Sequence, residues 1–286
     1  MKIDPPNNFS LRAKRLLAFA YTANASKNAL PWPSVISLKQ RLLAKGADIR
    51  ALSFALFFVF IECAVAETHQ YYEFRSQISI TKLDIIDRWD LNLFTSENAN
   101  LSSKNHDGVE PPVNIQNYFL AAPTYKFSPN LHFVFLGYIY QKTHPTFDNF
   151  INENRLFQQV VYSQNTNQGL LTHRLRFEQR FIHDVAPEQK FFGTRLRYQI
   201  GFLIPLQGKE LNNGEFYLNI YNEFYFTLTG VKATVYNENW TYAGIGYQSK
   251  KYGRFEIGPL LQRVIVEKQH DVRHFNLLQL SWSYNF

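Results

Sequence analysis

The sequence predicts an all-β fold, namely a transmembrane antiparallel up-and-down β-barrel of the outer-membrane type with 10–12 strands. Three observations support this fold class. From residue 67 onward the chain repeats segments in which apolar and polar side chains alternate. The last of these segments is rich in aromatic residues and ends on Phe286. The breaks between segments alternate between tight turns and longer loops, as expected of short periplasmic turns and longer outer loops.

Residues 1–66 differ from the rest of the chain and are expected to be a leader with a secretory signal peptide that is removed. Basic residues precede a short apolar run at 51–61, and Ala64-Val65-Ala66 follows it. A basic region, a short apolar core and a small-x-small cleavage site are the three parts of a signal peptide. The mature chain is therefore expected to be one domain, the barrel of residues 67–286.

The first 50 residues are longer than a normal leader needs, which favours a translation start downstream of Met1 that leaves residues 1–50 untranslated. N-terminal sequencing that begins at Glu67 would support this interpretation, and an intact Met1 would refute it. Cleavage before Glu67 also removes Cys63, the single cysteine of the chain. A mature chain without cysteine excludes disulfides, thiolate metal sites and cysteine nucleophiles.

The formal net charge of +7 does not indicate a nucleic-acid partner, because the charge is uneven. Residues 1–66 hold nine of the 30 basic residues and three of the 23 acidic ones, which leaves 21 basic and 20 acidic residues in 67–286. A nearly neutral mature chain lacks the basic surface that nucleic acids select. The sequence also holds no uninterrupted apolar run of the roughly 18–20 residues that a membrane-spanning helix needs.

Alternating patterns in the mature chain predict eleven strands. We place them near 71–82, 86–96, 114–127, 130–141, 149–163, 167–182, 191–206, 215–229, 238–250, 252–266 and 273–286. Single-chain bacterial barrels have an even number of strands, so eleven is an awkward count. If the last strand ends at the periplasm, 86–96 runs outward and the barrel that begins with 86–96 holds ten strands. The segment 71–82 is then either a periplasmic lead-in or half of an additional pair.

The C-terminal strand is predicted to close the barrel. One of its faces carries Leu278, Leu280, Trp282, Tyr284 and Phe286, and the other carries Gln279, Ser281, Ser283 and Asn285. A terminal strand that alternates aromatics and ends in Phe is typical of outer-membrane barrels. We therefore expect outer-membrane lipid and, through this strand, the barrel-assembly machinery as partners. The sequence leaves the oligomeric state open.

Charged residues gather on one face of several predicted strands, and these faces are expected to line the barrel interior because a charge at mid-bilayer costs about 2–4 kcal/mol. The residues are Glu153, Arg155, Arg174, Arg176, Glu178, Arg180, Arg195, Arg197, Glu223, Arg254 and Glu256. Two interpretations follow. The first is an electrostatic core in which each arginine has a carboxylate neighbour. The second is a passage lined with arginine for anionic ligands. The alternation of sign favours the first.

No catalytic, cofactor or metal motif stands out in the sequence. There is no Gly-x-Ser-x-Gly elbow, no His-x-Ser pair and no Gly-rich phosphate loop. The main hypothesis is thus a barrel with a narrow, Arg/Glu-lined lumen and a structural or transport role. One alternative is an outer-membrane enzyme that hydrolyses lipid or surface polymers through loop residues such as His183 and Asp184. The other is a soluble periplasmic β-sandwich that binds a ligand.

Several strand sequences resemble one bacterial family. They are Asn152–Gln159, Thr172–Phe181, Thr194–Tyr198, Tyr221–Phe224 and Gly244–Tyr247, and they include Glu-x-Arg and Arg-Leu-Arg-x-Glu-x-Arg pieces. These residues resemble the family known as domain of unknown function 2490 (DUF2490), over roughly residues 70–286. The resemblance implies a signal-peptide-bearing outer-membrane barrel of Gram-negative bacteria and supplies no catalytic residue.

Overall fold

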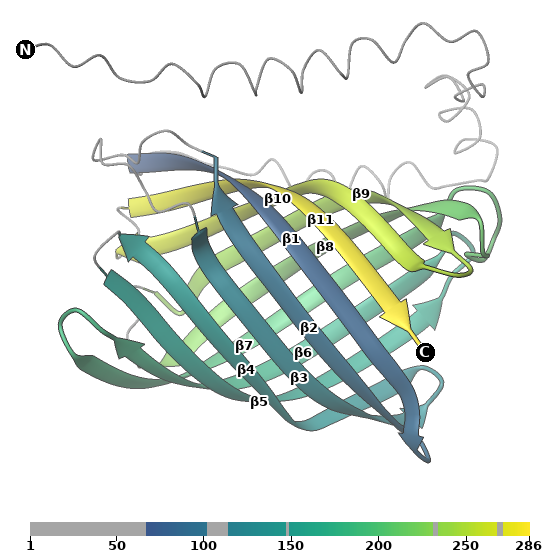
Figure 1. Cartoon of the computed structure of the whole chain (residues 1–286), viewed down its shortest axis with the longest axis horizontal. Helices are drawn as coiled ribbons and strands as arrows, with labels where there is room; N and C mark the ends of the chain where they lie inside the picture. The colour runs from purple at the N-terminus through teal and green to yellow at the C-terminus, as the bar shows by residue number, and fades with distance from the viewer. Residues whose placement is uncertain (1–66, 102–113, 147–148, 231–233, 268–270) are drawn as a thin grey trace, which may run out of the picture. The chain divides into compact units, whose positions relative to one another are not determined.

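Eleven β-strands form one closed barrel in the computed structural model, which describes residues 67–101, 114–146, 149–230, 234–267 and 271–286 (Figure 1). The strands are β1 (Glu67–Ile86), β2 (Trp89–Asn100), β3 (Asn114–Ser128), β4 (Leu131–Thr146), β5 (Asn149–Asn165), β6 (Leu170–Asp184), β7 (Gln189–Pro205), β8 (Glu215–Thr229), β9 (Tyr236–Ser249), β10 (Gly253–Glu267) and β11 (Asp271–Asn285). The predicted all-β barrel is confirmed. The predicted leader, 1–66, lies outside the described residues. Among those residues no helix is long and apolar enough to cross a membrane.

Each strand pairs with its neighbours in the sequence, and these pairs are antiparallel, as predicted for an up-and-down barrel. The barrel closes differently, because β1 pairs with β11 in parallel from Glu67↔Asp271 to Thr81↔Asn285. Figure 1 shows the two strands side by side, running in the same direction. The expectation of an even strand number is therefore wrong, although eleven lies within the predicted 10–12. In an up-and-down order the first and last of an odd number of strands run the same way, so the closure has to be parallel.

The parallel β1–β11 seam is long and regular. Parallel pairing is slightly weaker per residue than antiparallel pairing. The register continues without a bulge to Thr81, and two hydrogen bonds extend it beyond the last pair. Phe286 N donates to Thr81 O at 3.0 Å, and Leu83 N donates to Phe286 O at 2.8 Å. The segment 71–82, for which the sequence allowed either a periplasmic lead-in or half of an additional pair, therefore lies within β1, a full strand of the barrel.

The barrel has two rims, a C-terminal rim at which the chain ends and an opposite rim. The C-terminal rim holds Phe286 and connections 87–88, 129–130, 166–169, 206–214 and 250–252. At the opposite rim lie the other strand ends, which are joined in the sequence by residues 101–113, 147–148, 185–188, 230–235 and 268–270. The longest of these joining segments in the sequence, 101–113, follows a strand that ends at the opposite rim. The predicted alternation of lengths is otherwise wrong, because 206–214 is longer than 147–148 or 185–188. Asn212 N bonded to Glu215 Oε2 and Phe216 N bonded to Gln207 Oε1, both at 2.9 Å, order this long connection.

Period-two alternation sorts the side chains into an interior and an exterior face. On β8, Tyr217, Glu223 and Tyr225 are buried inside the barrel, whereas Phe216 and Leu228 are exposed outside. Apolar side chains also contribute to the interior. One buried cluster consists of Tyr118, Leu120, Ala122, Val134, Ile139 and Phe157, and another of Tyr242, Leu260 and Leu277. The interior is therefore filled in part by ordinary apolar packing.

Candidate functional site

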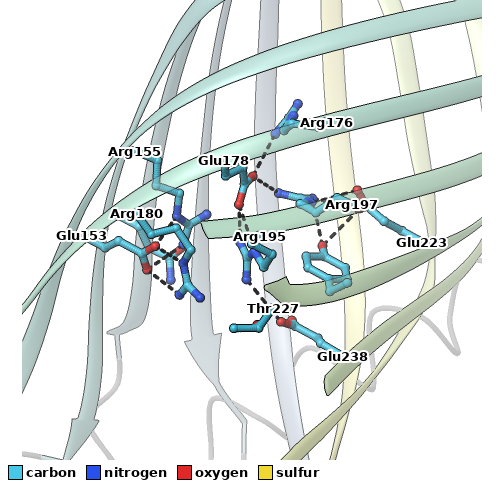
Figure 2. A network of polar contacts seen from close by, with 12 residues as sticks. Glu153, Arg155, Arg176, Glu178, Arg180, Arg195, Arg197, Glu223, Thr227 and Glu238 are labelled. Carbon is cyan, nitrogen blue, oxygen red and sulfur yellow. Dashed lines mark hydrogen bonds and ion pairs between the residues drawn. The ribbon is translucent and has the colours of Figure 1, made fainter. Parts of the chain in front are cut away.

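The buried carboxylate of Glu178 on β6 is one centre of an arginine–glutamate network in the barrel interior (Figure 2). Its Oε2 accepts hydrogen bonds from Arg195 Nε at 2.9 Å and Arg195 Nη2 at 2.7 Å. Its Oε1 accepts one from Arg197 Nη1 at 2.9 Å, and Arg176 Nη1 lies 3.8 Å away. The register explains this convergence, because Glu178 faces Arg195, and Arg176 faces Arg197, across β6 and β7.

Glu223 on β8 is the second centre. Arg197 reaches it with two prongs, Nε to Oε1 at 3.0 Å and Nη2 to Oε2 at 2.9 Å. Arg174 Nη2 donates to Oε1 at 2.9 Å, and the Tyr225 hydroxyl donates to Oε2 at 3.1 Å. The same hydroxyl accepts a hydrogen bond from Arg197 Nη2 at 2.9 Å. Arg197 therefore joins the carboxylates of two strands, β6 and β8.

Glu153 on β5 is the third centre. Arg155 Nε and Nη2 donate to its two oxygens at 2.6 and 2.9 Å. Arg180 Nε and Nη2 donate to the same two oxygens, the second at 3.0 Å (Figure 2). Arg155 Nη2 also donates to Gln141 Oε1 on β4 at 2.6 Å. One glutamate thus holds two arginines.

Hydrogen-bond capacity decides which arginines the network satisfies. A carboxylate offers about four acceptor positions. Glu153 and Glu223 each accept four hydrogen bonds, so both are filled. Arg176 receives only the longer contact with Glu178, and its remaining contacts are a hydrogen bond from Nε to Gln159 Oε1 at 2.8 Å and the Phe157 ring 4.5 Å from its guanidinium carbon. The network therefore holds more guanidinium donors than carboxylate acceptors.

Two of the charged residues predicted from the sequence lie apart from these three centres. Glu256 accepts hydrogen bonds from Asn219 Nδ2 at 3.2 and 3.1 Å. Arg254 is exposed near the C-terminal rim, and its Nε donates to Gln248 Oε1 at 2.6 Å. Both line a small cavity of about 190 Å³. The other nine predicted residues are all joined to Glu153, Glu178 or Glu223.

Further charged residues of the interior were not predicted from the sequence, among them Glu238, Arg75 and Glu73. Glu238 Oε2 lies 3.6 Å from Arg195 Nη1, and Glu238 Oε1 accepts a hydrogen bond from Trp240 Nε1 at 2.6 Å. Arg75 and Glu73 on β1 are both buried in the interior. Their alternate positions in the sequence could have indicated a charged interior face. The role of segment 71–82 was left open, so this face was not assigned.

A cavity of about 710 Å³ runs beside the network and is lined by residues of all eleven strands. The ionisable side chains in its wall are mostly basic. They are Arg75, Arg155, Arg174, Arg176, Arg180, Arg195, Arg197 and Arg273 against Glu73, Glu223 and Glu238. Aromatic rings of Phe94, Tyr221, Trp240 and Phe275 complete parts of the wall. The interior thus combines a filled, hydrogen-bonded half with a cationic cavity.

The residues considered for catalysis do not form a pair. His183 Nε2 lies 3.2 Å from Glu188 Oε1 in the 185–188 connection, whereas Asp184 Oδ1 accepts a hydrogen bond from Asn149 Nδ2 at 2.8 Å. The contact with His183, and then its charge, hold the pKa of the exposed Glu188 carboxyl below its usual range. Within the described ranges no group of three or more His, Cys, Asp or Glu is arranged to hold a metal ion.

The C-terminal strand residues predicted for assembly lie on the exterior face. Trp282 stacks on Tyr284 with ring centroids 6.3 Å apart, and Tyr284 stacks on Phe286 at 6.1 Å. Leu280, two residues before Trp282, is exposed on the same face. These side chains therefore form a continuous apolar ladder on the outside of the barrel.

Comparison with known proteins identifies one family. The sequence model of the family described as "Protein of unknown function (DUF2490)" matches residues 81–273, from the end of β1 to the start of β11. The resemblance found in the sequence is thereby confirmed. No curated protein matches the chain.

Proposed function

Because the chain belongs to the DUF2490 family, whose description assigns no activity, we propose from its own residues that it is an integral barrel of the Gram-negative outer membrane, with a narrow Arg/Glu-lined lumen and a structural or transport role. The observation that carries this proposal is the distribution of polarity. Ionised side chains are buried in the interior, whereas large apolar side chains are exposed outside. A barrel in water would have the opposite arrangement.

The exterior face of the central strands supports a lipid environment. The outward positions of β6 from Leu171 to Phe181, of β7 from Phe192 to Phe202 and of β8 from Phe216 to Leu228 contain no Asp, Glu, Lys or Arg. Outward amides bond to one another, as in the 2.9 Å hydrogen bond from Gln179 Nε2 to Gln158 Oε1. A charge facing lipid at the midplane would cost about 2–4 kcal/mol.

The height of this band also fits a bilayer. Leu171 and Phe181 bound it on β6, ten residues apart. At about 3.3 Å per residue and a tilt near 45°, that separation spans about 23 Å along the barrel axis. The apolar band of outer-membrane barrels is about 25 Å tall. We infer that the C-terminal rim faces the periplasm, since the closing strand ends there.

The interior favours a narrow lumen over a wide pore. Arginine and glutamate side chains from β5 to β9 join across part of the interior, and the buried apolar clusters occupy more of it. The cavity of about 710 Å³ offers room for a small solute beside these side chains. A transport role is thus restricted to small solutes, and a purely structural role needs no passage.

Membrane fractionation of the expressed protein tests the location. We expect it in the outer-membrane fraction, soluble only in detergent, with faster gel migration before heating than after it. A chain that stays soluble without detergent would refute the barrel in the membrane and favour a periplasmic sandwich. Planar-bilayer recordings test the lumen separately. We expect a conductance far below that of an open porin. A porin-like conductance would contradict the narrow interior.

A further inference from the structure

We propose that the cavity beside the arginine–glutamate network is a binding site for a small solute bearing an oxyanion, a phosphate or carboxylate group held by Arg75, Arg174 and Arg176. This inference goes beyond the proposed location, because it rests on the interior alone. It does not require the barrel to conduct.

Arg75 is the strongest reason for the proposal. Its side chain is buried, with 5% of the residue exposed, and it lines the cavity from β1. Its contacts are a hydrogen bond from Nη2 to Ser96 Oγ at 3.3 Å and the Trp240 ring, 4.9 Å from the guanidinium carbon. Its Nε is buried without a hydrogen-bond partner, and no carboxylate of the described residues forms an ion pair with it. A buried guanidinium without a counter-ion is costly.

Neighbouring carboxylates do not fill this gap. Glu73, two residues away on the same face of β1, accepts a hydrogen bond from Asn98 Nδ2 at 2.9 Å and forms no ion pair with Arg75. Glu238 is engaged by Trp240 and Arg195. Glu73 interacts with Arg75 electrostatically but not at ion-pair distance. Among the described residues, Arg75 therefore lines the cavity with no carboxylate bound to its guanidinium.

Arg174 and Arg176 present further unused donors from β6. Each guanidinium has five N–H groups. Arg174 uses Nη2 on Glu223, and its Nε is buried without a partner. Arg176 uses Nε on Gln159 and reaches Glu178 only at 3.8 Å. Glu223 already accepts four hydrogen bonds and Glu178 three. An added oxyanion would therefore meet N–H groups of Arg174 and Arg176 that these two carboxylates do not bind.

The three arginines converge on the same part of the interior. Trp240, against which Arg75 stacks, is the register partner of Glu223, and Glu223 is the carboxylate that Arg174 binds. The guanidinium carbon of Arg197 lies 6.0 Å from the same Trp240 ring. Arg174 and Arg176 are alternate residues on one face of β6. An anion in this part of the cavity would offset several like charges at once.

The chemistry of the cavity selects an oxyanion of a small solute. Guanidinium groups bind phosphate and carboxylate through paired hydrogen bonds, which a halide cannot form. The volume of about 710 Å³ falls within the roughly 300–1,000 Å³ of small-molecule sites. Aromatic rings such as Tyr221, Trp240 and Phe275 offer an apolar wall for the rest of the solute.

Trp240 supplies the readout for a test. In the full chain with Trp32, Trp89 and Trp282 replaced by Phe, it is the remaining tryptophan. Inorganic phosphate and sodium acetate are titrated separately, each against sodium chloride of matched ionic strength. We expect a saturable fluorescence change with at least one oxyanion, and its identity assigns the preferred head group. Changes that do not saturate, or that chloride reproduces, would overturn the proposal.

Substitutions of single arginines test whether Arg75 contributes to the binding site. Arg75→Gln keeps a side-chain donor near Ser96 but removes the charge, and we expect its Kd to rise roughly tenfold or more. Arg254→Gln removes an exposed arginine outside this cavity and should leave Kd unchanged. Unchanged binding in Arg75→Gln would overturn the proposal. If that variant does not fold, Arg75→Lys decides, because it keeps the charge and loses the paired geometry. Weaker binding would support the site, and equal binding would refute the role of Arg75.

Discussion

Arg197 and Glu223 form a two-pronged ion pair in the barrel interior, with Nε–Oε1 at 3.0 Å and Nη2–Oε2 at 2.9 Å. Arg197 is also bonded to Glu178 at 2.9 Å, so this one guanidinium connects β6 and β8 through its position on β7. Loss of the arginine would leave two buried carboxylates short of donors. The pair is therefore where the network is expected to be most sensitive to substitution.

Arg197→Met should lower the free energy of unfolding by about 3–5 kcal/mol, because removal of one partner leaves buried charges uncompensated. Urea unfolding of the purified barrel, followed by circular dichroism, measures the change. Arg254→Met is the matched control, since Arg254 is exposed, and should cost less than about 1 kcal/mol. Equal effects of the two substitutions would show that the network does not stabilise the fold.

Gly137→Ala should destabilise the barrel by roughly 1–3 kcal/mol, because the added methyl overpacks the interior. A Cβ at Gly137 would lie 2.2 Å from Phe157 Cζ, and the Phe157 ring also supports Arg176. Gly201→Ala is the control, since its Cβ would meet its nearest atom at 3.6 Å. Thermal unfolding of both variants decides, and a Gly137→Ala protein as stable as the control would contradict this packing.

A disulfide should form between cysteines at Ser79 and Ser283 in a Cys63→Ser background. These residues are register partners across the parallel β1–β11 seam and both line the small interior cavity. Paired strands lie about 4.7–4.9 Å apart, which suits disulfide geometry. Non-reducing electrophoresis after mild oxidation detects the link as altered migration.

The control for this cross-link is Ser79→Cys with Asn276→Cys. Asn276 pairs with Tyr72 and lies seven residues before Ser283, the register partner of Ser79. This second pair should stay reduced. Efficient cross-linking of it, with none between 79 and 283, would mean that the seam has another register or direction.

Deletion of Phe286 should reduce the amount of assembled barrel several-fold, because the residue completes both the seam and the exterior aromatic ladder. Its backbone bonds to Thr81 and Leu83, and its ring stacks on Tyr284 and lies 4.7 Å from Lys82 Nζ. Quantification of the heat-modifiable band in outer membranes measures assembly. Phe127→Ala, which removes an exposed aromatic of β3 at the same rim, should have a much smaller effect. Normal assembly without Phe286 would remove the C-terminal strand from any role as an assembly signal.

The sequence was sufficient for the orientation of side chains within each strand. A strand has a period of two, so one buried residue fixes the face of all its neighbours. For this reason Arg174, Arg176, Glu178 and Arg180 were correctly placed on one face. The eleven strands were also found, because polar breaks interrupt each alternating segment. The sequence did not predict that all eleven strands close into one barrel. Closure depends on how the two ends of the sheet meet and not on any single segment.

Only the tertiary structure decided which charges meet. Glu178 lies between Arg195 and Arg197 because the 185–188 connection and the regular pairing that follows set the register of β6 against β7, and a shift of one residue would separate them. Arg75 stayed hidden for the same reason, as its burial follows from the parallel closure of β1 on β11. Local alternation thus determined that charges line the interior. The long-range register determined which arginines the glutamates satisfy and which ones face the cavity.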